Sequence, residues 1–170
     1  MNPILSLLAW PKKVAAVDEA ALVYLNGKTA RILFAVAEAV IGADFKDKVP
    51  NFITTIDEYL GYQRRSSRQA LTQALLLVES SVVILLLGGG LHGFSHLSIA
   101  DRQRVLSRMK DHNQQLLRNL YAACVNIAAS TFYASEATWD EIQYDGVSVD
   151  HPEILAVPRW RPDDPRPVEK

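Results

Sequence analysis

The chain has 170 residues, of which 49% are hydrophobic and 22% are charged. This length predicts a single domain that buries roughly 70% of its unfolded surface. With 18 basic and 19 acidic residues the formal charge is −1, which excludes the strongly basic surface that binds nucleic acid. The single Cys124 excludes an internal disulfide, and its place in an apolar helical pattern predicts a buried, unreactive thiol.

Residues 1–16 form a short apolar arm. Its hydrophobic stretch, Ile4 to Trp10, is followed by Lys12 and Lys13, whereas a secretory signal peptide has its basic residues in front. We therefore expect a cytoplasmic location, or a periplasmic one only if the protein is exported together with a partner. The arm is expected to fold back on the core or to dock on a partner or a membrane.

Residues 17–146 are predicted to form an all-α domain, a compact helical bundle. Asp18 to Leu25 is expected to be a short helix that ends at Asn26-Gly27. Apolar residues at helical spacing predict a second helix from Ala30 to Gly42 and a third from Phe52 to Gly61. Between these two, residues 43–49 are expected to be a polar loop.

The longest apolar run, Ala70 to Leu87, has about the length of a membrane-spanning helix. Glu79 lies inside it, and an ionisable residue there costs roughly 3 kcal/mol on insertion scales. We therefore predict the long, fully buried central helix of a bundle, with a membrane-spanning helix as the less favoured alternative. The triple glycine 88–90 is expected to end this helix. A phosphate cradle is disfavoured because no Lys or Ser/Thr follows at P-loop spacing.

Two further helices are predicted, from Ile99 to Lys110 and from Gln114 to Ala134. Ser98 is expected to cap the first, with Asp101 in the capping-box position. The outward face of that helix is expected to carry Arg102, Arg104 and Arg108. A last short helix, capped by Ser135, is expected to run through Tyr144.

The segment 147–170 is predicted to be an extended, proline-rich C-terminal tail. Five prolines exclude a helix there. Its apolar residues, including Trp160, exceed those of a solvated linker. The tail is therefore expected to lie along a partner, with packing on its own bundle, or disorder, as the alternatives.

Few residues suit bond-making chemistry. His92 and His96 are four residues apart and, with His112, could share a metal ion. Gly93 lies between the first two, and no carboxylate accompanies them at ligand spacing. Loop or capping roles are therefore favoured, and a stand-alone helical metalloprotein remains the alternative function.

Adjacent carboxylates occur at Asp57-Glu58 and at Asp140-Glu141. On a helix, neighbouring side chains point about 100° apart, so neither pair is a ready acid–base dyad. Both pairs are expected to be solvated. The sequence contains no nucleophile-elbow or Cys-x-x-Cys motif.

The most distinctive segment runs from Thr131 to Gly146. An apolar helix ends in Phe132-Tyr133, a capped turn carries Trp139, and Tyr144 lies two residues before a glycine. The segment has no nucleophile beside a base, but it offers flat aromatic surface of the kind that anchors a partner.

These features, in this order, resemble the gluconate 2-dehydrogenase subunit 3 family. Its members are small subunits of flavin-dependent sugar and alcohol dehydrogenases of the glucose-methanol-choline oxidoreductase group. The resemblance spans about Leu25 to Gly146 and rests on residues 30–42, 52–60 and 94–106 and on the aromatic ending. The chain departs from the family in lacking a twin-arginine leader and in having Asp145 where a Gly-Pro-type turn is frequent.

The resemblance implies a non-catalytic helical subunit that holds no cofactor of its own. FAD and hydride abstraction would belong to the large subunit, which the small subunit stabilises or helps to mature. A cytochrome or another acceptor would receive the electrons. No nucleic acid and no transmembrane span are expected.

The anchors expected at the partner interface are Phe132, Tyr133, Trp139, Tyr144 and Trp160. For Trp139 and Tyr144 the alternative is that they only pack the last helix onto the bundle.

Overall fold

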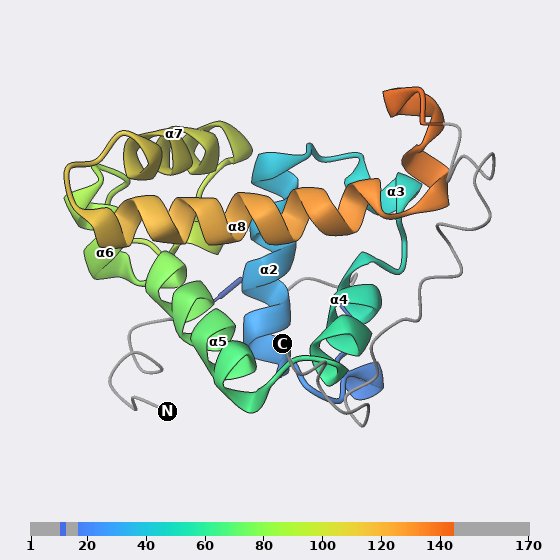
Figure 1. The fold of residues 1–170 in the computed structure, drawn as a ribbon. Coiled ribbons are helices and arrows are strands. Elements are labelled where there is room, and N and C mark those ends of the chain that lie inside the picture. Colours follow the sequence, from blue (N-terminus) through green and yellow to red (C-terminus); the bar gives the residue numbers. More distant parts are fainter. Residues whose placement is uncertain (1–10, 13–16, 145–170) are drawn as a thin grey trace, which may run out of the picture. The chain divides into compact units, whose positions relative to one another are not determined.

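The fold is that of a computed structural model, shown in Figure 1, which describes residues 11–12 and 17–144. Most of the predicted apolar arm, and the C-terminal tail with Trp160, lie outside these residues. Every regular element in the described part is a helix or a 3-10 turn, which confirms the all-α class.

The helices of the described part, in chain order, are α2 (Gly27–Val40), α3 (Phe45–Lys48), α4 (Phe52–Gly61), α5 (Arg65–Glu79), α6 (Ser81–Leu86), α7 (Ile99–Lys110) and α8 (Gln115–Tyr133). The 3-10 turns are η1 (Glu19–Ala21), η2 (Phe94–His96), η3 (Glu136–Thr138) and η4 (Asp140–Ile142). The predicted helices 30–42, 52–61, 99–110 and 114–134 thus correspond to α2, α4, α7 and α8. The Ser98 hydroxyl accepts a hydrogen bond from the Asp101 amide, as the capping box predicts.

The expected helix from Asp18 to Leu25 is wrong, because only the turn η1 forms there. The amide groups of Val23, Tyr24 and Leu25 instead donate to the Asp57 carboxylate, at 2.8, 2.9 and 2.5 Å. A buried side chain thus satisfies donors that a helix would have satisfied with its own carbonyl groups. The segment therefore runs as an irregular strap against α4.

The loop expected at residues 43–49 contains the short helix α3. It forms because Phe45 is buried, with its ring edge-on to Phe34 at 5.0 Å and to Phe52 at 5.1 Å between centroids. This aromatic packing joins α2, α3 and α4. The polar residues around Phe45 therefore led to the prediction of a loop, although this segment belongs to the core.

The prediction of one long, buried central helix from Ala70 to Leu87 is also wrong. Ser80, with ψ 121°, is extended and separates α5 from α6. The buried central helix is α2, nine of whose residues are buried. It contacts α4, α5, α7 and α8, and in Figure 1 it crosses behind α8.

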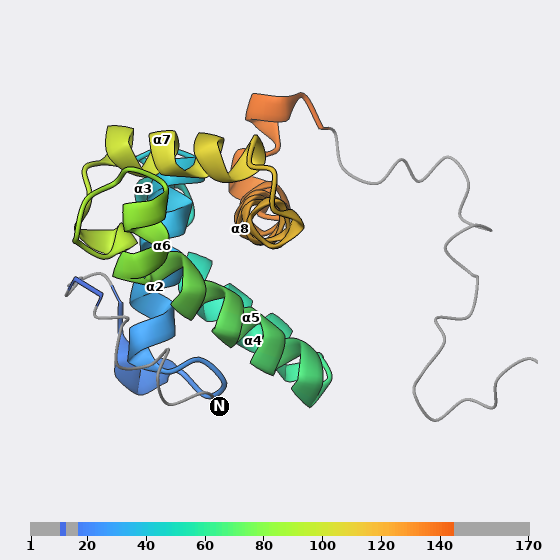
Figure 2. The ribbon, with the colours of Figure 1, turned by 90° about the vertical axis from the view of Figure 1, so that its left-hand side faces the viewer.

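The remaining helices surround α2. Figure 2, which views α8 nearly end-on, shows α7 above α2, with α4 and α5 together on one side of it. The glycines after α6 end it as predicted, since Gly88 and Gly90 have φ of +69° and +87°. The chain divides into two units after Thr138, and the second unit begins at Trp139.

Candidate functional site

The predicted aromatic anchors fall in different environments. Phe132 is only 3% exposed and belongs to the core, so its ring is not available to a partner. Tyr133, which stacks edge-on against it at 5.3 Å between ring centroids, is 47% exposed. Tyr133 is therefore the anchor candidate that α8 presents at its surface.

Trp139 and Tyr144 lie in the second unit, around η4. Their rings meet edge-on with centroids 5.1 Å apart, and the Tyr144 amide donates to the Trp139 carbonyl at 3.0 Å. Gln143 adopts a left-handed conformation, with φ 53°, which turns the chain back between them. The single short helix expected from Ser135 is instead the two turns η3 and η4. The predicted anchor Trp160 lies outside the described residues.

A groove between α4 and α8 is the main apolar hollow found in the first unit. Its volume is about 680 Å³. On α8 it is lined by residues at helical spacing, and on α4 by Thr55 and Tyr59. The α8 lining residues are Ala123, Asn126, Ile127, Ala129, Ser130, Thr131 and, just past the helix end, Ala134. A second hollow of about 270 Å³ shares Thr55, Thr131 and Ala134 and extends the groove toward Pro50. We call this continuous feature the α4/α8 groove.

Small side chains make this groove deep. Alanine, serine and threonine leave the α8 backbone accessible, which allows another helix to pack closely. Tyr59 is 56% exposed and forms part of the opposite wall. The lining of the main hollow contains no charged residue.

Asp57 holds the α4 wall in position. It is 3% exposed and accepts hydrogen bonds from the amides of Val23, Tyr24 and Leu25. Its expected solvated position is therefore wrong, although the neighbouring Glu58 is exposed. Such a fully hydrogen-bonded buried carboxylate fixes the helix that carries it.

Three buried polar residues form a network that the sequence did not indicate. Glu79, fully buried at the end of α5, accepts from the Ser95 amide and hydroxyl, each at 2.8 Å. Arg102 donates to the Ser95 carbonyl at 2.8 Å and to Glu38 at 2.6 Å. The expected outward position of Arg102 is therefore wrong, since this side chain is 6% exposed overall. The Lys12 amide also donates to the Ser95 hydroxyl at 2.8 Å.

This network joins α5, η2, α7 and α2. Burial raises the pKa of Glu79, and the hydrogen bonds from Ser95 oppose that rise. The hydrogen bonds from Ser95 to Glu79 and from Arg102 to Ser95 and Glu38 fix the position of η2, while the buried Arg102 Nε has no hydrogen-bond partner.

The three histidines lie at the surface or in loops. His92 and His96 are exposed, and His112 is half-buried. His112 Nδ1 accepts the Gln114 amide at 3.1 Å, which is a loop-capping role. Among the residues that the structure describes, no three His, Cys, Asp or Glu side chains gather as a metal site would require.

Cys124 is buried on α8, as predicted. Burial raises the pKa of its thiol to about 12, so the thiolate that would react is not formed at neutral pH.

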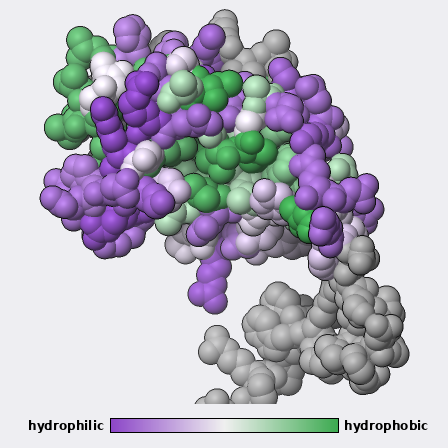
Figure 3. Space-filling model, turned by 90° about the horizontal axis from the view of Figure 1, so that it is seen from above, coloured by the Kyte–Doolittle hydropathy of each residue, from purple (hydrophilic) through white to green (hydrophobic). Residues whose placement is uncertain are grey.

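Hydrophobic side chains also lie in the open around α7. Figure 3, which faces the side on which α7 lies in Figure 1, shows apolar side chains in its middle with hydrophilic ones around them. A hollow of about 320 Å³ between α2, α7 and α8 is lined by Val40, Leu106, Tyr121 and Val125. Some apolar side chains of the described domain are therefore exposed on this side and not packed into the core.

Comparisons with protein-family models, with curated proteins and with solved structures found no match. Within the described residues, no helix combines the length and the apolar character needed to cross a bilayer.

Proposed function

We propose that this chain is a non-catalytic helical subunit that binds and stabilises a larger FAD-dependent dehydrogenase of the glucose-methanol-choline type. The observation that carries the proposal is the α4/α8 groove. Its main hollow has no charged lining residue and is open along α8, and the groove extends to the end of that helix.

The shape of the groove favours a polypeptide over a small molecule. Small-molecule pockets are concave and surround most of the ligand, with a few converging polar groups. Here the groove is open along its length and is lined by alanines and hydroxyl residues at helical spacing. Such a surface suits an apolar helix of a partner, which would bury Tyr59 and Ile127.

The identity of the partner comes from the family resemblance. In that family the large subunit holds FAD and oxidises a sugar or a related alcohol, and a cytochrome or another acceptor receives the electrons. The chain described here would contribute a rigid helical surface, fixed by α2 and by the buried polar network. Redox chemistry would take place entirely in the partner.

Co-purification tests this proposal. The full chain, tagged and co-expressed with the candidate large subunit, should retain a flavin-containing polypeptide in a defined stoichiometry. Ser130→Glu should weaken this retention by about tenfold or more, because docking would bury an unpaired carboxylate in an apolar groove. The flavin absorption of the eluate gives the readout.

Ala122→Glu is the matched control. Ala122 is also exposed on α8 but does not line the groove. It should leave retention unchanged. Equal retention by both variants would show that the groove is not the interface, and the absence of any flavoprotein with the wild-type chain would refute the proposed function itself.

A further inference from the structure

A positively charged surface lies where α4 ends and α5 begins. Arg64 and Arg65 are exposed there, and Arg68 follows three residues later on α5. Residues 59–78 contain these three arginines and no Asp or Glu. The exposed acid just before this stretch is Glu58, so positive charge prevails where the two helices meet.

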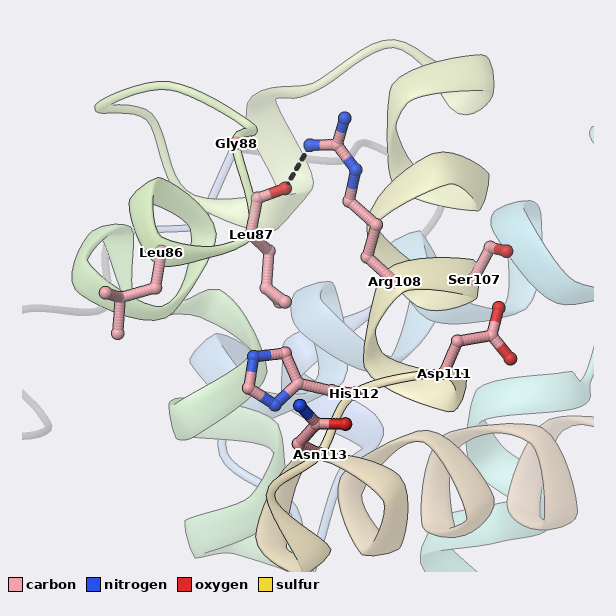
Figure 4. A pocket seen from close by; sticks show the side chains of 8 residues that line it. All are labelled: Leu86, Leu87, Gly88, Ser107, Arg108, Asp111, His112 and Asn113. Carbon is pink, nitrogen blue, oxygen red and sulfur yellow. Dashed lines mark hydrogen bonds between the residues drawn. The ribbon is translucent and has the colours of Figure 1, made fainter.

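Two of these arginines have no partner among the described residues. The side chains of Arg64 and Arg65 form no hydrogen bond or ion pair there. The other arginines of the described part are each engaged by a carboxylate, a carbonyl group or an aromatic ring: Arg31, Arg68, Arg102, Arg104, Arg108 and Arg118. Figure 4 shows one such contact, from Arg108 to the Leu87 carbonyl at the end of α6. Within the described part of the chain, Arg64 and Arg65 therefore keep their donors for an acceptor on another molecule.

Three tyrosines border the arginines. Tyr62 is 90% exposed, the highest value among the large hydrophobic and aromatic side chains of the described residues, and Tyr59 is 56% exposed. Tyr24 packs against Gly61, where a Cβ would lie 2.9 Å from its ring, and the Arg68 guanidinium lies 4.9 Å from the centroid of that ring. Exposed tyrosine beside arginine is typical of the residues that dominate binding energy at protein interfaces. We call the three arginines and the three tyrosines the α4–α5 corner.

The acidic residues of the neighbouring strap are engaged elsewhere. Asp18 accepts the Ala20 amide at 3.1 Å. Glu19 pairs with Arg31 on α2 at 3.2 Å. The Asp57 carboxylate is buried under the strap, where it accepts three backbone amides. Within the described part of the chain, the positive charge of the corner is therefore not paired.

The corner continues the α4/α8 groove. Tyr59 belongs to both, since it lines the α4 wall, and Tyr62 lies three residues further along the same side of the helix end. In Figures 1 and 2 the connection from α4 to α5 lies away from α8, so a segment that follows the α4 wall past Tyr59 reaches the arginines. At the opposite end of the groove, near Pro50, Lys48 is paired with Asp44 at 3.2 Å. The unpaired positive charge therefore lies at one end only of the part of the groove that the structure describes.

We infer that the α4–α5 corner binds acidic residues of the polypeptide segment that occupies the α4/α8 groove. Carboxylates of that segment accept hydrogen bonds from Arg64 and Arg65, and apolar side chains beside them pack on Tyr59 and Tyr62. The inference rests on the proposed function, because the segment belongs to the same large subunit. It adds that this segment is acidic where it leaves the groove beside Tyr59.

The composition of the corner favours a polypeptide over an anionic membrane. Recruitment to a membrane by charge takes a cluster of roughly four to eight basic residues, whereas the corner has three arginines. A planar guanidinium binds a carboxylate through two parallel hydrogen bonds, and exposed tyrosines add the contact area that anchors a protein partner. An acidic segment with apolar side chains matches both features.

Retention of the co-expressed large subunit measures the contribution of the corner. The Arg64→Gln, Arg65→Gln double variant of the full chain should weaken this retention by about fivefold at low salt, because two charged contacts are lost. Arg64→Lys, Arg65→Lys keeps the charge and should retain more flavoprotein than the glutamine variant. Added salt should reduce the difference between the wild-type chain and the glutamine variant.

Arg104→Gln, Lys110→Gln is the matched control. It removes the same charge from two exposed residues of α7, neither of which lines the groove. This variant should retain the flavoprotein like the wild-type chain. Circular dichroism of both glutamine variants should show unchanged helix content, because all four side chains are exposed.

A peptide-binding assay tests the same chemistry without the large subunit. The probe is a fluorescein-labelled helical peptide of leucines and alanines with glutamates at both ends, and the control probe has lysines in their place. The wild-type chain should bind the glutamate peptide about fivefold more tightly than the lysine peptide. This preference should disappear in the Arg64→Gln, Arg65→Gln variant, whereas Ser130→Glu should weaken binding of both peptides.

Three results would overturn the inference. One is equal binding of both peptides by the wild-type chain. Another is normal flavoprotein retention by the Arg64→Gln, Arg65→Gln variant when Ser130→Glu loses it, which leaves the proposed function intact. The third is binding to phosphatidylcholine vesicles containing phosphatidylserine that the same double variant loses, because the corner would then serve a membrane. If no form of the chain retains a flavoprotein, the proposed function fails, and the preference between the two peptides decides the inference.

Discussion

Helices α2 and α6 are both rich in apolar residues, but α2 is buried and one side of α6 is exposed. Leu33 on α2 is fully buried, whereas Leu86 on α6 is 75% exposed, although Val82 to Leu87 is the longest unbroken run of large apolar residues. The α2 helix lies between four other helices, while α6 is a single short helix after a break at Ser80. Hydrophobicity therefore does not decide burial here. The exposed residues Val82, Leu85 and Leu86 form an apolar patch on the surface of α6.

A matched pair of substitutions tests this comparison most strongly. Leu33→Ala should lower the free energy of unfolding by about 3 kcal/mol, because it leaves a cavity in a packed core. Leu86→Ala should change the same quantity by less than about 0.5 kcal/mol. Urea denaturation of both variants measures the difference. A comparable loss in the two would mean that the exposed side of α6 is part of the core.

Asp57 provides the next largest effect, because it holds the α4 wall of the groove. Asp57→Asn should cost about 2 kcal/mol, since an amide cannot accept from all three amide groups of Val23, Tyr24 and Leu25. Hydrogen exchange of those three amides should accelerate. The neighbouring, exposed Glu58→Gln is the control and should change neither quantity.

Substitution of Gly88 and Gly90, the two glycines with positive φ after α6, tests what stabilises the end of this helix. Gly88→Ala and Gly90→Ala should each cost about 1 kcal/mol, because both positions have positive φ. Gly88→Ala should cost more, since its Cβ would displace the Arg108 guanidinium, whereas nothing lies within 4 Å of a Cβ at Gly90. Thermal unfolding of the pair measures the excess. Equal losses would show that Arg108 is not held against Leu87.

The smallest expected effect is the pH dependence conferred by Glu79. Its raised pKa means that the folded state binds the proton more tightly than the unfolded state. Its contribution to stability is therefore greatest below the unfolded pKa and decreases as pH rises through the folded pKa. Glu79→Gln should cost about 1 kcal/mol near pH 4.5, and the difference from the wild-type chain should shrink toward pH 7.5.

Urea denaturation of both forms across that range checks the direction. A difference that grows with pH would contradict the assigned pKa shift. Glu58→Gln, at an exposed position outside the buried network, is a control for general charge effects.

The sequence predicted the helices that carry a clear periodic stripe and a cap. α4 and α7 are found at their expected limits because Gly61 follows one stripe and Ser98 caps the other. The break at Ser80 was not predictable, because it depends on Glu79 binding Ser95, which lies sixteen residues further along the chain. Helix periodicity carries no information about such a long-range polar contact.

The candidate site was predicted less well than the fold. The end of α8 was identified through its aromatic residues, yet Phe132 is in the core and only Tyr133 among the first pair is exposed. The groove depends on small residues such as Ala123 and Ser130, to which the sequence analysis assigned no site. Alanines at the spacing of one α8 face, opposite a tyrosine of α4, were the signal that could have revealed it.

Native mass spectrometry of the full chain, purified under non-denaturing conditions after co-expression with the candidate large subunit, tests the central claim most directly. The proposal predicts a defined complex in which flavin is carried by the larger polypeptide and this chain has its unmodified mass. A chain that remains uncomplexed, or that carries a prosthetic group of its own and oxidises an alcohol alone, would contradict it.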